Sequence, residues 1–103
     1  MAYPHPNLLP IGAGGLSQKL TLGTGAAVQS AVVTNTETPV YYNAFATADF
    51  FIRAGTNPTA VATGVDQFIP ANILLRLGPL KVGERFSVIA ATTGGLLYLT
   101  PEN

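Results

Sequence analysis

The sequence predicts an all-β fold, a single antiparallel β-sandwich of jelly-roll type that is preceded by an extended N-terminal arm. Three observations predict it. Short apolar runs recur at spacings of roughly 8 to 14 residues, as in small sandwiches. Turn-forming residues separate the runs, with 11 glycines and 8 prolines among 103 residues. No segment has the length and periodicity of an amphipathic helix. One domain is the expectation for this length.

The first element is an arm over residues 1–16, and the sandwich is expected over residues 17–103. Three prolines exclude a helix interior from the arm, because each fixes φ and lacks an N–H donor. The arm nevertheless carries large apolar side chains, which a solvated linker would not need. We expect it to dock on a neighbouring subunit; an arm folded back on its own domain and a frayed terminus are the alternatives. The expected interface residues are Tyr3, Leu8, Leu9 and Ile11.

Strands are expected in the first half of the sandwich at residues 19–22, 26–33, 40–45 and 48–53. Valines favour a strand over a helix in the second run, which also lacks a helix cap. The third and fourth runs are aromatic and β-branched, the composition typical of strands. Alternation in the fourth places Phe50 and Ile52 on one face, and Asp49, Phe51 and Arg53 on the other.

In the second half, a turn at 55–59 precedes a possible short strand at 60–63. Residues 66–70 lead into a strand at 73–77, and Pro70 places an edge or a strand start there. Gly78 and Pro79 are expected to break the chain. Strands 85–90 and 96–100 are expected to pair as a C-terminal hairpin. Its turn, residues 92–95, ends in two glycines that suit the positive φ of tight hairpins.

Charge is scarce in this chain. Five basic and five acidic residues give a net charge of zero, where about 26 charged residues would be typical. This excludes a basic nucleic-acid clamp, and no apolar run is long enough for a transmembrane helix, so neither nucleic acid nor membrane is an expected partner. Because neutral, apolar domains are poorly soluble alone, the composition suggests a surface that other protein copies cover.

No residue pattern predicts catalysis, a cofactor or a metal. His5 is the single histidine and lies in the arm, where nothing holds it beside a nucleophile. The carboxylates are isolated in sequence. Asp49 and Asp66 could in principle form the pair that glycoside hydrolysis needs, but surface positions or pairing with Arg53 and Arg76 is the better interpretation. We therefore expect a protein that is not an enzyme.

Aromatic residues are concentrated in one stretch. A single-stranded nucleic-acid platform would need a basic groove beside such rings, and the five basic residues are scattered. We expect the rings to pack in the core, while sugar binding through an exposed Tyr41 or Tyr42 stays open. The rings belong to Tyr41, Tyr42, Phe45, Phe50 and Phe51.

Four segments occur in an order that resembles small virion proteins of tailed bacteriophages. They are FIRAGTNPTA at 51–60, FIPA at 68–71, GERFSVIA at 83–90 and GGLLYLT at 94–100. The resemblance implies a capsid decoration, or cement, protein on the capsid exterior of the virion. Such a protein binds the major capsid protein as a dimer or trimer and staples capsid subunits together without covalent bonds. A phage tail, fibre or adaptor component is the alternative, and a carbohydrate-binding module is a weaker one.

Overall fold

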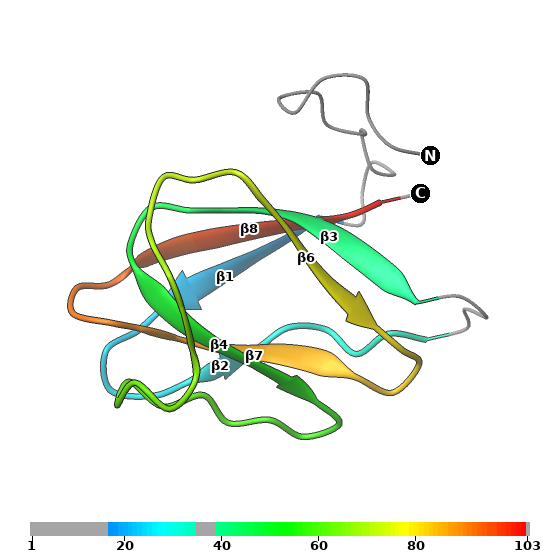
Figure 1. Cartoon of the computed structure of the whole chain (residues 1–103), viewed down its shortest axis with the longest axis horizontal. Helices are drawn as coiled ribbons and strands as arrows, with labels where there is room; N and C mark the ends of the chain where they lie inside the picture. The colour runs from blue at the N-terminus through cyan, green and yellow to red at the C-terminus, as the bar shows by residue number, and fades with distance from the viewer. Residues whose placement is uncertain (1–16, 35–38, 103) are drawn as a thin grey trace.

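The computed structural model describes residues 17–34 and 39–102, and these form eight strands. No helix of the described residues is long and apolar enough to cross a membrane. The predicted all-β class is confirmed (Figure 1). The strands are β1 (Gln18–Leu22), β2 (Val28–Gln29), β3 (Val40–Ala46), β4 (Phe50–Gly55), β5 (Gln67–Ile69), β6 (Leu75–Leu80), β7 (Arg85–Ala90) and β8 (Gly95–Pro101).

The strands form two four-stranded antiparallel sheets, ordered β1-β8-β3-β6 and β2-β7-β4-β5. Four of the pairings are those of one long hairpin folded at its middle: β1 with β8, β2 with β7, β3 with β6 and β4 with β5. The pairs β3–β8 and β4–β7 then close the two sheets. This rolled hairpin is the jelly-roll topology, so the predicted sandwich is confirmed.

The core lies between the sheets and follows the two-residue period of the strands. In β3, Tyr42, Ala44 and Ala46 are buried, while the residues between them are more exposed. The ring of Tyr42 meets the ring of Phe86 from β7 edge-to-face at 5.5 Å, which joins one sheet to the other. Burying each large apolar side chain contributes about 1.5–3 kcal/mol. The largest fully buried side chains are Phe50, Leu22, Leu80, Leu97, Leu99, Val88 and Ser87.

Two of the predicted strands are wrong in extent. Within 26–33 only Val28–Gln29 is a strand, and residues 60–63 form no strand. In both runs, backbone N–H groups form hydrogen bonds that do not belong to a strand pairing. The N–H of Val33 donates to the carbonyl of Glu84 outside any strand, and the N–H of Ala60 donates to the hydroxyl of Ser87. In both runs, hydrogen bonds of a loop rather than of a strand ladder satisfy these backbone N–H groups.

Gly78 and Pro79 do not break the chain as predicted, because β6 runs through them. β6 is an edge strand, where proline's missing N–H costs little. The pairing with β3 shifts register between Val40 and Tyr42. At this irregularity Gly78 has a φ of 126°, and a Cβ on it would lie 2.9 Å from the Val40 carbonyl oxygen. Glycine is therefore required for this close approach.

The predicted C-terminal hairpin is also wrong. β7 and β8 belong to different sheets, and residues 91–94 carry the chain from one sheet to the other. Gly94 and Gly95 lack the positive φ expected of a tight hairpin; the described glycines that have it are Gly64, Gly78 and Gly83. Gly95 instead allows close packing, since a Cβ there would lie 2.7 Å from the Cβ of Ala48.

Candidate interaction surface

Four of the six exposed large apolar side chains of the described residues are concentrated in one segment, while Val82 and Tyr98 lie elsewhere. Val65 is 74% exposed, Phe68 44%, Ile73 43% and Leu74 50%. All four lie within ten residues that hold β5 and its flanking loops, where the chain passes from one sheet to β6 in the other (Figure 1). We call these four residues the apolar strip. Several large apolar side chains exposed close together along the chain make this segment a candidate interaction site.

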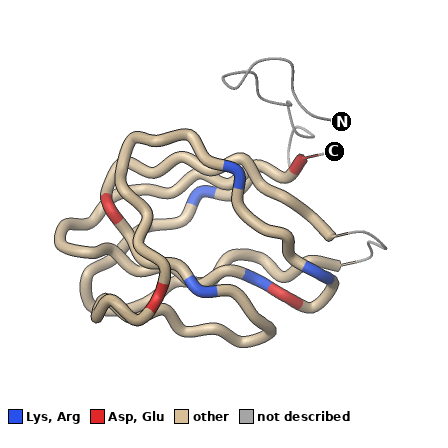
Figure 2. Tube along the Cα trace, in the orientation of Figure 1, with Lys and Arg blue, Asp and Glu red and all other residues tan. Residues whose placement is uncertain are grey.

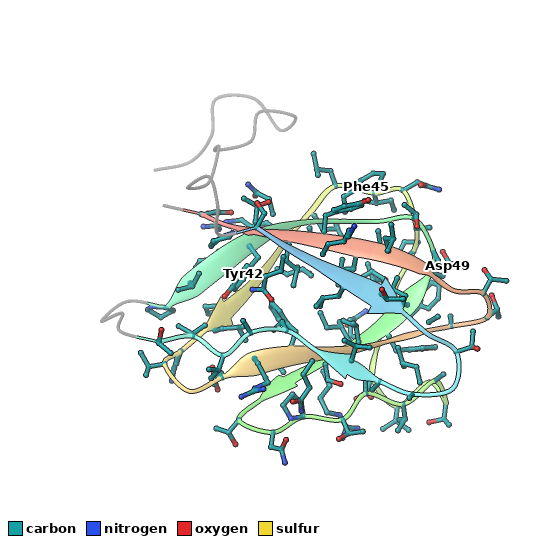
Figure 3. The ribbon with its side chains drawn as sticks, turned by 180° about the vertical axis from the view of Figure 1, so that it is seen from behind. Tyr42, Phe45 and Asp49 are labelled. Atoms are coloured by element: carbon teal, nitrogen blue, oxygen red, sulfur yellow. The ribbon has the colours of Figure 1, made fainter. Side chains whose placement is uncertain are left out.

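Hydrogen bonds hold the backbone of the strip in place. The carboxylate of Asp49 accepts from the N–H of Ala71 at 2.6 Å, and the N–H of Asn72 donates to the Ala46 carbonyl at 2.8 Å. Asn72 has a φ of 61°, a left-handed conformation that asparagine tolerates better than most residues. The loop between β5 and β6 is thereby fixed to the β3–β4 connection (Figure 3).

Packing between two phenylalanine rings supports Phe68 of the strip. Phe68 on β5 pairs with Phe51 on β4, and their rings meet edge-to-face at 5.5 Å. Phe51 is opposite Ile89 of β7 in the same sheet. Phe68 is therefore held on the outer face of the β2-β7-β4-β5 sheet by a row of apolar neighbours, although nearly half of its surface stays open.

The one charged residue between the strip's ends is tied to its own domain. Asp66 accepts from the N–H of Val61 at 2.8 Å and from Arg53 Nε at 2.6 Å. The Val61 N–H, helped by the Arg53 guanidinium, holds the pKa of the Asp66 carboxyl below its usual range, although desolvation opposes the shift. The expected pairing of Asp66 with Arg53 is confirmed. Figure 2 shows the remaining charges spread over the domain.

The prediction that the clustered rings pack in the core is only half right. Tyr42 and Phe50 are buried there, and burial raises the pKa of the Tyr42 hydroxyl. Tyr41, Phe45 and Phe51 alternate with buried neighbours and point to the outer faces. Figure 3 shows Tyr42 between the sheets and Phe45 outside them. A composition rich in rings could not predict this split, but strand alternation could have done so.

The Tyr41 ring has a partner within its own domain. The guanidinium carbon of Arg76 lies 3.9 Å from the centre of the Tyr41 ring, a cation–π contact. Arg76 Nε also forms an ion pair with Glu102 at 2.8 Å. Arg76 therefore pairs with Glu102 rather than with either of the two aspartates that the sequence suggested.

The interface residues predicted from the sequence, Tyr3, Leu8, Leu9 and Ile11, lie outside the described residues, as does His5. The sequence did not predict the apolar strip, since residues 66–70 were expected to lead into a strand at 73–77. In the structure β5 is only three residues long, and the apolar residues on either side of it are left exposed. Pro70 correctly indicated an edge, because β5 pairs only with β4.

The carboxylates of the described residues serve the fold. Asp49 and Asp66 each bind a backbone N–H, and a carboxylate oxygen of Glu84 accepts from the N–H of Lys81 across a turn. Within residues 17–34 and 39–102, no three His, Cys, Asp or Glu side chains gather as a metal site would require. Beside these structural carboxylates, the described residues offer exposed apolar contact surface.

Comparison with known proteins adds no assignment: no family model, no curated protein and no solved structure matches this chain.

Proposed function

We propose that this protein is a bacteriophage virion component that decorates the capsid exterior and stabilises it by non-covalent contacts with the major capsid protein. The observation that carries the proposal is the apolar strip, whose four side chains are 43–74% exposed on a domain with only ten charged residues. A freely diffusing protein would be expected to carry more charge on such a surface.

The chemistry of the strip favours a permanent protein partner. Stable, long-lived interfaces are more apolar than transient ones. Asp66, the strip's charged neighbour, is already paired with Arg53, so a partner would not need to desolvate an unpaired charge there. A strip of four large side chains supplies contact energy without a requirement for an opposite charge. This suits binding to a repetitive shell, where many weak contacts add up.

The fold is compatible with this role. The jelly roll is a recurring architecture in viral capsid proteins, although it also occurs in lectins and cupins. Fold alone does not assign function, and the sequence resemblance to phage virion proteins supports the choice among these options. Homo-oligomerisation as a dimer or trimer belongs to the proposal, since a neutral domain does not repel its own copies.

A deletion in the phage tests the proposal. Particles that lack the protein should lose their genomes at lower temperature or milder osmotic shock than complete particles, and the protein should be detected in purified heads. Unchanged resistance, with the protein missing from purified heads, would contradict the proposal. Density on the tail in electron micrographs of labelled particles would instead support the tail or fibre alternative.

A further inference from the structure

We propose that the outer face of the β2-β7-β4-β5 sheet holds a docking groove for the N-terminal segment, residues 3–11, of a neighbouring copy of this chain. The groove has a volume of about 660 Å³. Its walls are residues 25–27, between β1 and β2, and residues 58–62, between β4 and β5. Its floor includes Gln29, Ser87 and Ile89.

The groove is built for an apolar occupant. None of its lining residues is charged, and its walls consist mainly of glycine, alanine and proline. The polar groups of its floor are already used within the domain. The Ser87 hydroxyl accepts from the N–H of Ala60 at 2.9 Å, and Gln29 Nε2 donates to the Pro58 carbonyl at 2.7 Å. The surface that is left for a ligand is lined by small side chains, and it has room for larger side chains of the ligand.

The N-terminal segment has the matching chemistry. It carries no charged side chain between Tyr3 and Ile11, and its large side chains alternate with prolines. Prolines fix the φ angle wherever they occur in a chain, which lowers the conformational entropy that is lost on binding. Pro-rich extended segments docking in shallow grooves are an established recognition mode. The side chains that would fill the groove are those of Tyr3, Leu8, Leu9 and Ile11.

The segment is long enough to reach a neighbouring copy of the chain. The described chain begins at Ser17, whose hydroxyl lies 2.9 Å from that of Thr100. The side chain of Gln18 accepts from the N–H of Ala31, two residues beyond Gln29 in the groove floor. The N-terminal segment therefore joins the described domain at Ser17, beside β8.

The apolar residues lie much farther along the chain. Ile11 is six residues before Ser17 and Tyr3 is fourteen before it, which gives reaches of about 20 Å and about 46 Å in extended form. The longest dimension of the molecule is 37 Å. Tyr3 can therefore reach past its own domain. Exchange of such arms is a low-cost route to symmetric assemblies, and this inference rests on the proposed function for the presence of several copies together.

Disulfide trapping tests the inference, because the chain contains no cysteine. Copies with Leu9→Cys are mixed with differently tagged copies that carry Ala26→Cys, an exposed position on the groove wall, and oxidised glutathione is added. We expect a disulfide between the two tagged chains, which requires Cα atoms within about 7 Å. Adding Ala62→Arg to the groove-bearing copy should lower its yield about tenfold by blocking the opposite wall.

Ala31→Arg is the matched control, since Ala31 is also exposed but does not line the groove. It should leave the yield unchanged, and thermal melting checks that both arginine variants fold. A chain carrying both Leu9→Cys and Ala26→Cys that forms only internal disulfides would overturn the inference, as would equal yields with the two arginines. Since the experiment uses purified protein, a positive result stands even if the protein proves absent from phage heads.

Discussion

Gly95 shows how a single residue can be required for packing without any special backbone angle. Its position would place a Cβ 2.7 Å from the Cβ of Ala48 and 2.7 Å from the Thr47 hydroxyl. Ala48 is buried and cannot move aside. Gly95→Ala should therefore lower the free energy of unfolding by about 1–3 kcal/mol, the usual cost of overpacking. Denaturant unfolding monitored by tyrosine fluorescence measures it.

Gly25→Ala is the control for this change. A Cβ at Gly25 would meet no atom within 4 Å, and its φ is not positive, so stability should change by less than about 0.5 kcal/mol. If the two alanine variants unfolded at the same denaturant concentration, the close approach at Gly95 would not be real.

A second prediction concerns Asp66 and the pH dependence of the protein's stability. Its pKa is lowered in the folded protein, first by the Val61 N–H and then by Arg53. A carboxyl with a lowered folded-state pKa stabilises the protein above its unfolded-state pKa, and this contribution is lost as pH falls through the folded-state value. Asp66→Asn should therefore melt at a lower temperature than wild type at neutral pH.

The difference between the Asp66→Asn variant and wild type should shrink as the solution is acidified below the ordinary aspartate pKa, because wild type then loses the charge that the variant already lacks. Melting curves across an acidic pH series measure it. A difference that stayed constant over the whole series would show that the carboxylate charge contributes nothing to stability.

Among the elements, the long β4–β5 connection is anchored to its sheet by two buried residues, Pro58 and Ala60, while most of its other residues are exposed. Ser87, fully buried in β7, receives the N–H of Ala60. Ser87→Ala would leave that buried N–H without its acceptor, which costs about 1–3 kcal/mol. We expect this loss of stability together with faster proteolytic cleavage within residues 56–66.

Thr63→Ala is the matched change in the same connection, because Thr63 is exposed. It should alter the free energy of unfolding by no more than about 0.5 kcal/mol. A Ser87→Ala variant as stable as the Thr63→Ala variant, and cleaved no faster, would mean that the hydrogen bond to Ala60 does not anchor the connection.

The elements that the sequence predicted well are those whose signal is local. Alternation in the 48–53 run placed Phe50 and Ile52 on one face and Phe51 on the other, as observed. The errors concern partners distant in sequence. Thr92 to Gly95 has the composition of a hairpin turn, yet β7 pairs with β4 and β2, and β8 with β1 and β3. Turn residues permit a reversal but do not choose which strands pair.

At the scale of the whole molecule, the proposed function gives low charge and the apolar strip one explanation, a surface that other subunits cover in an assembly. The sequence predicted the low charge but not the strip. Phe68 lies in the 66–70 run, and Ile73 and Leu74 lie in the strand expected at 73–77. In the structure β5 is only three residues long and β6 begins at Leu75, and these three side chains are exposed. Hydrophobic periodicity in a sequence identifies which face of a strand is apolar. It cannot show where the folded domain leaves such a face uncovered because no second layer packs against it.

The most direct test of this account measures rebinding of the purified protein to phage heads that lack it. Leu74→Glu places a charge on the apolar strip, while Val82→Glu does so at a comparably exposed position outside it, the two side chains being 50% and 54% exposed. The account predicts that wild type and Val82→Glu bind heads and restore heat resistance, whereas Leu74→Glu binds at least about tenfold more weakly. Equal binding by all three proteins, or binding by none, would contradict it.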